Sequence, residues 1–435
     1  MNMGTASEFR VRGDGFVPAS RYTAQEFADL EFERLWSRVW QIAGREEMVG
    51  RPGMAIEYTI GDDSIIVVRQ DDGSLAAFHN TCRHRGTRLV EDALDATDGC
   101  IRCPYHGWQY ALDGRLVHVP DREDFDNLPA ELGLRPVRVD SFGGFVFINM
   151  DDGAEPLLDF LAPLPELLAP FHLDRMRLRR ARSTVIDANW KAIVDAFNEG
   201  YHVQGLHPQI LPWTDDVSIA YEQLGTHARY GRLPGARREL RPSPRLGSDD
   251  YDEGEILAGM IEGLGGAFMA DERAAVAELR ASGPPAGETL LSAYQARRHE
   301  LLSARGVDVS AFTPEQMTSA EDVHWFPNFV GPIYPGSALL FRVRPYRRDP
   351  DRSVKDTWVL DWPADVDAYE LPEMHFTEDW TERRWGEITE QDYANLANVQ
   401  RGMKSRACEG LWLNPRQEGN ILQMHHVIDR YVGGS

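Results

Sequence analysis

The spacing of apolar residues changes twice along the chain, and these changes divide it into three segments. Over residues 23–45, apolar side chains recur at helical intervals, which predicts a helix. From Met54 onward, the apolar runs shorten to about five residues separated by Asp and Gly, which predicts short antiparallel strands. Beyond Gly153, helical and strand patterns are mixed, which is typical of an α+β domain.

The middle segment contains predicted strands at residues 56–60, 65–69, 75–79, 137–139 and 145–148. Together they indicate an all-β meander or barrel. The last segment predicts helices over residues 166–171, 189–201, 290–305 and 387–403, and strands over residues 338–344 and 357–361. Residues 237–255 are charged and contain Pro242 and Pro244, which predicts a loop.

Composition and charge restrict the classes of function. The 435 residues are 42% hydrophobic and 26% charged, as expected of a globular protein with a sizeable core. The net charge of −23 argues against nonspecific binding to nucleic acid or anionic membranes. No apolar run approaches the ~18 residues of a membrane-spanning helix, and the first twenty residues lack a secretory-signal pattern. We therefore expect a cytoplasmic protein without a disulfide framework.

Three of the four cysteines lie in one stretch, NTCRHRGTRLVEDALDATDGCIRCPYHGWQY, over residues 80–110. Its metal-binding candidates are Cys82, His84, Cys103 and His106. Structural zinc sites usually pair two cysteines on one loop, whereas here each loop offers one Cys and one His. This order favours a two-iron Rieske cluster, and structural zinc is the alternative.

The remaining cysteines fit no clear metal site. Cys100 could form a Cys-x-x-Cys zinc loop with Cys103, but a small buried thiol is the preferred interpretation. Cys408 has no cysteine or histidine partner nearby in the sequence, and we assign it no role.

A second set of metal-binding candidates follows NWKAIVDAFNEGYHVQGLHP from residue 189. Asp195, Glu199 and His202 are spaced to share one face of the predicted helix. Gly205 would end the helix and let His207 return beside His202. Two histidines and one carboxylate would form a facial triad for ferrous iron. The alternative is two ordinary histidines near a helix end.

The missing carboxylate is predicted on the helix over residues 387–403. Asp392 falls within a stripe of apolar residues, where an acid is costly unless it is paired or binds metal. Glu387 and Glu390 lie off this stripe and are predicted to be solvated. The alternatives for Asp392 are a position near a helix cap or pairing with an arginine.

These motifs together resemble the large (α) subunit of Rieske non-haem iron oxygenases, the ring-hydroxylating oxygenase family. The resemblance covers nearly the whole chain in order. Its stretches are CRHRG at residues 82–86, CPYHGW at residues 103–108, NWK at residues 189–191, the spacing of Glu199, His202 and His207, and QD with VQRG between residues 391 and 402.

The resemblance implies a Rieske-type [2Fe-2S] cluster in the β-rich domain. Cys82 and Cys103 would bind one iron of the cluster, and His84 and His106 would bind the other. It implies an N-terminal helical segment over residues 1–40 that packs on the catalytic domain. A small all-β Rieske domain over residues 41–155 would follow. Residues 156–435 would form the larger α+β catalytic domain, with an antiparallel sheet flanked by helices.

In the catalytic domain, the resemblance implies that His202, His207 and Asp392 bind mononuclear Fe(II). Glu199 would be the family's bridging acid, which links an iron histidine to a cluster histidine of a neighbouring subunit in a trimer. Asp195 is a second candidate catalytic acid. Family members often have Glu-Asn-Phe where this chain has Asp-Ala-Phe at residues 195–197, so the family's asparagine has no counterpart here.

The implied function is that of a terminal oxygenase component. Electrons would come from an NAD(P)H-dependent reductase, with or without a ferredoxin, and a homotrimer with or without a β subunit is expected. The expected reaction is hydroxylation of a small aromatic substrate with O₂. The alternatives are a monooxygenase or demethylase acting on an N-methyl, O-methyl or aliphatic carbon, and an electron-transfer protein without oxygenase activity. Phe197, Val203 and Asn328 are predicted to line the substrate pocket, and His425 and His426 to be solvated.

Overall fold

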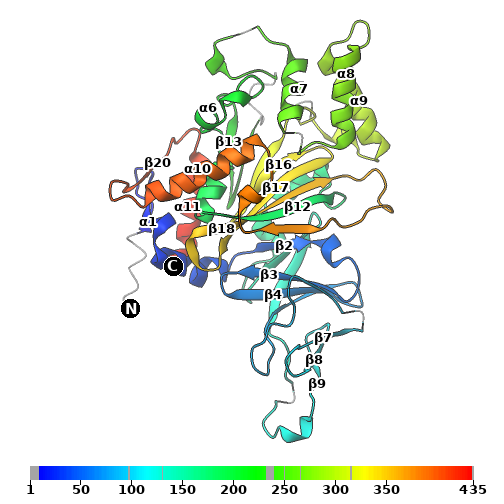
Figure 1. Cartoon of the computed structure of the whole chain (residues 1–435), viewed down its shortest axis with the longest axis vertical. Coiled ribbons are helices and arrows are strands. Elements are labelled where there is room, and N and C mark those ends of the chain that lie inside the picture. The colour runs from blue at the N-terminus through cyan, green and yellow to red at the C-terminus, as the bar shows by residue number, and fades with distance from the viewer. Residues whose placement is uncertain are drawn as a thin grey trace. The chain divides into compact units, whose positions relative to one another are not determined.

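The computed structural model describes residues 9–96, 98–129, 131–231, 240–248, 250–264, 266–313 and 316–433. The chain forms two compact units (Figure 1). The smaller unit is Leu30–Phe160, and the larger unit combines the residues up to Asp29 with those from Leu161 onward. Within the described residues, no helix is long and apolar enough to cross a membrane.

The smaller unit is built from antiparallel strands, as the sequence predicts. Its main sheet has the order β2-β11-β10-β5-β4-β3-β6. These strands are β2 (Gln41–Arg45), β3 (Met54–Ile60), β4 (Asp63–Arg69), β5 (Leu75–His79), β6 (Ala93–Asp95), β10 (Pro136–Phe142) and β11 (Phe145–Asn149). A second sheet contains β7 (Cys100–Arg102), β8 (Gln109–Ala111) and β9 (Leu116–His118). The buried residues of both sheets share one hydrophobic core.

The larger unit contains an eight-stranded sheet of order β13-β14-β15-β16-β17-β18-β12-β19. Its strands are β12 (Arg177–Ile186), β13 (Ala220–Leu224), β14 (His227–Gly231), β15 (Glu321–Trp325), β16 (Phe329–Tyr334), β17 (Ser337–Tyr346), β18 (Asp349–Asp361) and β19 (Met374–Thr377). Neighbouring strands are antiparallel except for β12 and β19. A two-stranded sheet pairs β1 (Phe16–Pro18) with β20 (Gly410–Trp412). This combination confirms the predicted α+β class.

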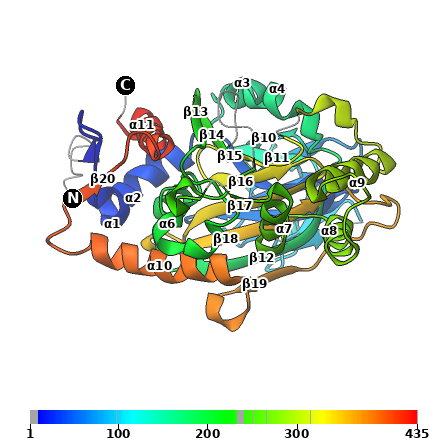
Figure 2. The same cartoon turned by 90° about the horizontal axis from the view of Figure 1, so that it is seen from above.

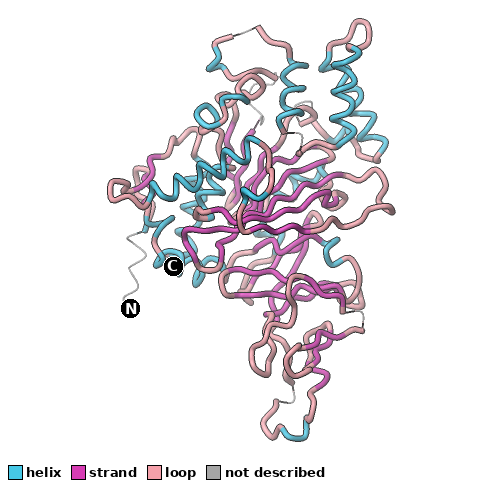
Figure 3. Tube along the Cα trace, viewed as in Figure 1, coloured by secondary structure: helices cyan, strands magenta, loops and turns pink. Residues whose placement is uncertain are grey.

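Helices surround this sheet, as the tube in Figure 3 shows. They are α1 (Ser20–Thr23), α2 (Gln25–Glu31), α4 (Leu164–Leu168), α5 (Trp190–Ala196), α6 (Val203–Leu206), α7 (Glu253–Gly263), α8 (Ala270–Ser282), α9 (Leu290–Ala304), α10 (Glu387–Met403) and α11 (Gly419–Val432), with α3 (Leu157–Leu161) at the boundary of the units. Helix α5 packs on β17 and β18, and α10 packs on α5 and β12. Figure 2 shows α10 beside β12. The α5–α10 pair therefore brings two distant parts of the sequence together over the sheet.

The elements predicted over residues 23–45 and 237–255 differ from the structure. The helix predicted over residues 23–45 ends in a π-helical turn at Phe32–Trp36, and residues 41–45 form strand β2. All five β2 residues are buried, and four of them pair with β11, so long-range pairing overrides the local helical pattern. Part of the loop predicted over residues 237–255 lies outside the described residues, and α7 begins at Glu253 within it.

Candidate functional site

The turn that follows α5 positions the first predicted iron ligand. Helix α5 begins at the N-cap Asn189, whose side chain accepts a hydrogen bond from Lys191 N (3.1 Å). It ends at Ala196, and not at residue 201 as predicted. The Glu199 carboxylate accepts hydrogen bonds from the backbone N–H groups of His202 (3.1 Å) and Tyr201, and these bonds close the turn instead of continuing the helix.

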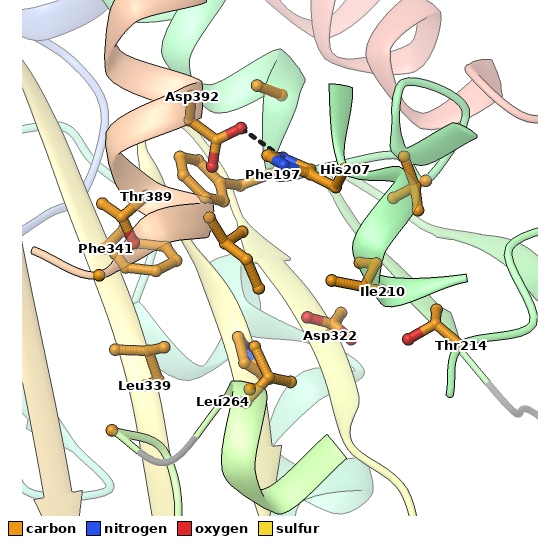
Figure 4. A pocket seen from close by; sticks show the side chains of 18 of the residues that line it. Phe197, His207, Ile210, Thr214, Leu264, Asp322, Leu339, Phe341, Thr389 and Asp392 are labelled. Carbon is orange, nitrogen blue, oxygen red and sulfur yellow. Dashed lines mark hydrogen bonds and ion pairs between the residues drawn. The ribbon is translucent and has the colours of Figure 1, made fainter. Parts of the chain in front are cut away.

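His202, His207 and Asp392 converge although they come from different elements. Their ligand atoms all lie within 4.8 Å of one another. Asp392 Oδ1 is 2.8 Å from His207 Nε2 and 3.9 Å from His202 Nε2. Figure 4 shows Asp392 on α10 facing His207 across the end of a cavity. Asp392 and His207 are 4% and 2% exposed, so this carboxylate is buried beside two imidazoles, as a metal site requires.

The hydrogen bonds of the two histidine rings orient them. His202 Nδ1–H donates to Glu199 Oε1 (2.5 Å), and His207 Nδ1–H donates to Gln391 Oε1 (2.7 Å). In both rings Nε2 is left to face Asp392. Such partners on the second ring nitrogen are a general feature of histidine ligands. Sequence reasoning did not assign Gln391 this role, and its only signal was the position next to Asp392.

The electrostatics of the site favour a bound cation. Burial favours the neutral His202 ring, but the hydrogen bond and charge of Glu199, together with the charge of Asp392, raise its pKa overall. The negative potential that stabilises a proton on the ring also stabilises a metal ion. Two imidazole nitrogens and one carboxylate oxygen are the donor set of ferrous facial-triad sites. The residues present therefore fit a mononuclear iron.

Asp195 lies apart from these three side chains in a buried network. Its Oδ2 accepts a hydrogen bond from Tyr22 OH (2.7 Å), and the Tyr22 oxygen lies 2.6 Å from His425 Nε2. Burial raises the pKa of Asp195 to about 8, so the acid is mostly protonated at neutral pH. The expectation that His425 is solvated is wrong, because its side chain is 0% exposed and Arg21 Nε donates to its Nδ1 (3.1 Å). His426 is exposed, as predicted.

In the smaller unit, two tight loops carry the predicted cluster ligands. Cys82 and His84 lie between β5 and β6, and Cys103 and His106 lie between β7 and β8. In each loop a glycine with positive φ donates its backbone N–H to the cysteine carbonyl, at 2.9 Å for Gly86 and 3.1 Å on the second loop. The two loops thus have the same backbone design.

The side chains of these loops also fit an iron–sulfur cluster. Both cysteines are 2% exposed, and the rings of His84 and His106 lie 4.4 Å apart between centroids. Among the described residues, the buried Nδ1 of His84 has no hydrogen-bond partner, although buried polar atoms are normally paired. Trp108 stacks on the His84 ring at 4.9 Å, and Tyr110 OH lies 3.3 Å from Cys82 Sγ. Together with the neighbouring His106 ring, this nitrogen and the two buried thiols supply the two-Cys, two-His donor set of a Rieske cluster.

A cavity of about 350 Å³ opens beside the three predicted iron ligands (Figure 4). Phe197 and Val203 line it, as does Phe341, whose ring centroid is 4.5 Å from that of Phe197. Asn328 does not line it, which corrects the expectation. Its side-chain amide is buried and donates to Val343 O (2.7 Å), so it holds the start of β16 against β17.

Two protein-family models match the chain. The Rieske [2Fe-2S] domain matches residues 39–132. The ring hydroxylating alpha subunit (catalytic domain) matches residues 173–261 and 267–434, which is more than half of the chain.

Curated relatives include oxygenase subunits of different specificity. The glycine betaine monooxygenase oxygenase subunit of Chromohalobacter salexigens is 31% identical over 93% of this chain and 83% of that protein. The carnitine monooxygenase oxygenase subunit of Escherichia coli is 35% identical, but over only 47% of this chain and 54% of that protein. The benzene 1,2-dioxygenase subunit alpha of Pseudomonas putida is 37% identical over 43% of each chain.

Solved structures show the same fold. A quaternary ammonium Rieske monooxygenase in complex with L-carnitine superposes with a TM-score of 0.67 at 18% identity, over 99% of both chains. Naphthalene 1,2-dioxygenase with indole bound superposes with a TM-score of 0.69 at 22% identity, over 100% of this chain and 96% of that one.

Proposed function

The chain belongs to the ring-hydroxylating α-subunit family of Rieske oxygenases, and we propose that His202, His207 and Asp392 hold its mononuclear iron. The observation that carries this proposal is the convergence of these three side chains at one end of a 350 Å³ cavity. When bound there, ferrous iron supplies the activation of O₂ for oxidation of a substrate carbon. The family carries a Rieske [2Fe-2S] cluster as well.

For that cluster, we assign the four loop ligands Cys82, Cys103, His84 and His106. The unpaired buried Nδ1 of His84 and the two buried thiols support this assignment. His106 is only partly buried, so one edge of the loop pair reaches the surface of its unit. Electrons from a partner reductase or ferredoxin would enter through the cluster.

Around the iron, the chain's own residues position its ligands and exclude water. Glu199 and Gln391 fix the ring orientations of His202 and His207 through the hydrogen bonds at 2.5 and 2.7 Å. The aromatic pair Phe197 and Phe341 covers one wall of the cavity with apolar surface. A substrate held against this wall would present a C–H bond to the open side of the three ligands.

We propose a homotrimer in which Glu199 links His202 to the partner subunit's His106. Two features of Glu199 support this proposal: its hydrogen bond to His202 and the 8% of its surface that remains exposed. A bridging acid would use the first to hold the iron histidine and the second to reach the partner subunit. We also propose a cytoplasmic location, because NAD(P)H is the ultimate electron source and the four cysteines are free.

Two substrate classes fit the cavity. A small aromatic compound fits its ring-lined wall and its volume. The second candidate is oxidation of an N-methyl carbon, and it is favoured by the relative that aligns over 93% of this chain, a glycine betaine monooxygenase subunit. An electron-transfer protein without oxygenase activity is disfavoured by the assembled set of three iron ligands.

Replacement of the carboxylate ligand tests the proposal. In Asp392→Ala we expect the visible and EPR spectra of the Rieske cluster to persist while mononuclear iron and product formation are lost. The control is Asn398→Ala, an exposed position on the same helix, which should retain both irons and activity. The assays are iron and acid-labile sulfide content and product mass with a surrogate reductase. Undiminished turnover in Asp392→Ala would show that another carboxylate binds the iron.

A further inference from the structure

One acidic side chain in the cavity, Asp322, has no partner among the described residues. No hydrogen bond or ion pair reaches its carboxylate from the part of the chain that the structure describes. Two other cavity acids are already neutralised, since Asp215 pairs with Arg241 (3.4 Å) and Asp216 with Arg245 (2.7 Å). Glu199 and Asp392 contact the two histidines, and Glu387 is exposed to solvent. Asp322 is therefore the partly buried acid that remains available to a ligand.

The sheet register aims Asp322 into the cavity together with an aromatic ring. Asp322 on β15 is directly opposite Tyr230 on β14 and Pro332 on β16. Directly opposed residues on antiparallel strands project from the same face, and Tyr334 follows two residues after Pro332 on that face. All four side chains line the cavity, and Figure 4 shows the carboxylate facing the enclosed space.

An unpaired carboxylate in this position is costly without a ligand. Burial raises the pKa of Asp322 to about 7, and no hydrogen bond offsets this effect. Burial and then the charge of Asp322 raise the pKa values of Tyr230 and Tyr334, so both rings remain neutral phenols. A carboxylate flanked by neutral aromatic rings attracts a cation through its charge and through the faces of the rings.

We propose that Asp322 determines substrate specificity by binding a quaternary ammonium group, with Tyr230 and Tyr334 contributing their ring faces. A quaternary ammonium has no N–H to donate, so it suits a carboxylate that lies beside rings and has no hydrogen-bond donor among the described residues. An aromatic hydrocarbon in the same place would cover the partly exposed carboxylate of Asp322 without compensating its charge. This inference rests on the proposed function, because the cavity is that of the oxygenase.

Arg241 lines an adjoining cavity together with Asp322 and is paired with Asp215 (3.4 Å). Two further basic side chains of the cavity start far from Asp322 along the sheet. Arg180 and Arg182 belong to β12, and strands β16, β17 and β18 separate β12 from β15. Four interstrand steps of ~4.8 Å place the two strands about 19 Å apart along the sheet. The two guanidinium groups therefore start from the opposite side of the cavity and leave the Asp322 side acidic.

Binding of matched cationic and neutral compounds tests the role of Asp322. Glycine betaine would be compared with its carbon isostere 3,3-dimethylbutanoate, and choline with 3,3-dimethylbutan-1-ol. Dissociation constants would be measured by calorimetry on the anaerobic holoenzyme, for the wild type and for Asp322→Asn. Asp215→Asn is the matched control, because it removes a cavity acid that already has an arginine partner.

In the wild type we expect at least one cation to bind at least about tenfold more tightly than its neutral isostere. Asp322→Asn should reduce this preference at least about tenfold and change the Kd of the neutral compound less than about twofold. Asp215→Asn should keep the preference. Equal or undetectable binding of both cations by the wild type, or a preference that persists in Asp322→Asn, would overturn the inference.

Product formation separates this inference from the proposed function. Oxygen-dependent product from an aromatic compound, without any cation preference, would refute the role of Asp322 and leave the oxygenase intact. A cation preference that requires Asp322, without product from any substrate and with the cluster fully reduced, would support the role of Asp322 and refute the oxygenase.

Discussion

Two side chains outside the proposed ligand set orient the histidines that we assign to the iron. Glu199 and Gln391 each accept a hydrogen bond from the Nδ1–H of one histidine and leave its Nε2 toward Asp392. Gln391 is itself held by Gln209, whose amide donates to the same oxygen (2.7 Å). The orientation of the two histidine rings therefore depends on two acceptors outside the ligand set, the charged carboxylate of Glu199 and the neutral amide of Gln391.

Replacement of Gln391 by Leu should weaken iron binding. The change removes the acceptor that holds His207, and loss of such an outer partner typically costs about 10- to 100-fold in metal affinity. The measurement is an anaerobic Fe(II) titration of iron-depleted protein, with Gln391→Glu expected to restore most of the affinity. An unchanged titration curve in Gln391→Leu would mean that His207 is held by other contacts.

Replacement of Glu199 by Gln should slow electron transfer between the two redox centres. The amide keeps the shape of the turn but loses the charge that supports His202, so both cofactors should remain bound while electron transfer between them slows. Single-turnover oxidation of the reduced cluster, followed by absorbance, measures this rate. Wild-type rates in Glu199→Gln would refute its role as a bridge.

His324 should make the fold sensitive to acid. Burial lowers its pKa to about 4, and its neutral ring pairs with Pro327 O (3.1 Å) and the Asn198 amide (3.4 Å). The pKa of His324 in the folded state lies below the unfolded value of 6.5, so its neutral ring contributes to the free energy of unfolding. This contribution is complete above pH 6.5 and is lost as the pH falls toward 4. The difference between the two pKa values corresponds to a contribution of about 3 kcal/mol to the free energy of unfolding.

The pH dependence of melting checks this prediction. Between pH 7.5 and pH 5, the melting temperature of His324→Gln should fall less than that of the wild type, because Gln retains a donor and an acceptor without titrating. Equal losses in the two proteins would show that other groups account for the acid sensitivity.

At the scale of elements, α5 and α10 meet over the sheet and bring the ligands together, while β15 to β17 form a wall of the cavity. This wall depends on close backbone contact between β16 and β17. Gly331 has a φ of +146°, and a Cβ there would clash with the carbonyl oxygen of Leu339, a cavity residue. The strand pair therefore requires glycine at this position.

Gly331→Ala should destabilise the protein and distort the cavity. The clash is with backbone, which cannot rotate away, so a loss of about 1–3 kcal/mol or more is expected. Gly402→Ala on α10 is the contrasting change, since a Cβ there meets nothing within 4 Å and alanine favours a helix. Thermal melting of both variants would show a decrease for the first and no decrease for the second. A melting temperature for Gly331→Ala equal to that of the wild type would contradict the predicted clash.

At the scale of the whole molecule, each unit carries its own ligand set. The proposed cluster ligands lie in Leu30–Phe160, and the proposed iron ligands and the cavity lie in the larger unit. Each set has its own buried surroundings, so loss of one cofactor need not disturb the other.

Selective iron removal should therefore affect one unit. Anaerobic treatment with a ferrous chelator should abolish product formation and lower the melting temperature of the larger unit, because a bound metal stabilises the fold that holds it. The Rieske EPR signal should be retained, and added Fe(II) should restore both activity and melting temperature. Loss of the Rieske signal together with the mononuclear iron would contradict the independence of the two sites.

The sequence by itself determined which residue types could bind the cofactors and in what order. The mixed Cys/His loops, the two spaced histidines and the acid within an apolar stripe are local patterns, so they can be read without a fold. The strands of the β-rich segment and the helix over residues 387–403, which the structure confirms, are also local. Such patterns arise from neighbouring residues whose spacing is set by the backbone.

Only the tertiary structure decided which side chains meet. It ended α5 at Ala196, converted residues 41–45 into a strand and buried His425 in a network with Tyr22. It also left Asp322 without a partner among those cavity residues that the structure describes. Burial and pairing depend on contacts between segments hundreds of residues apart, and no periodicity within either segment encodes them.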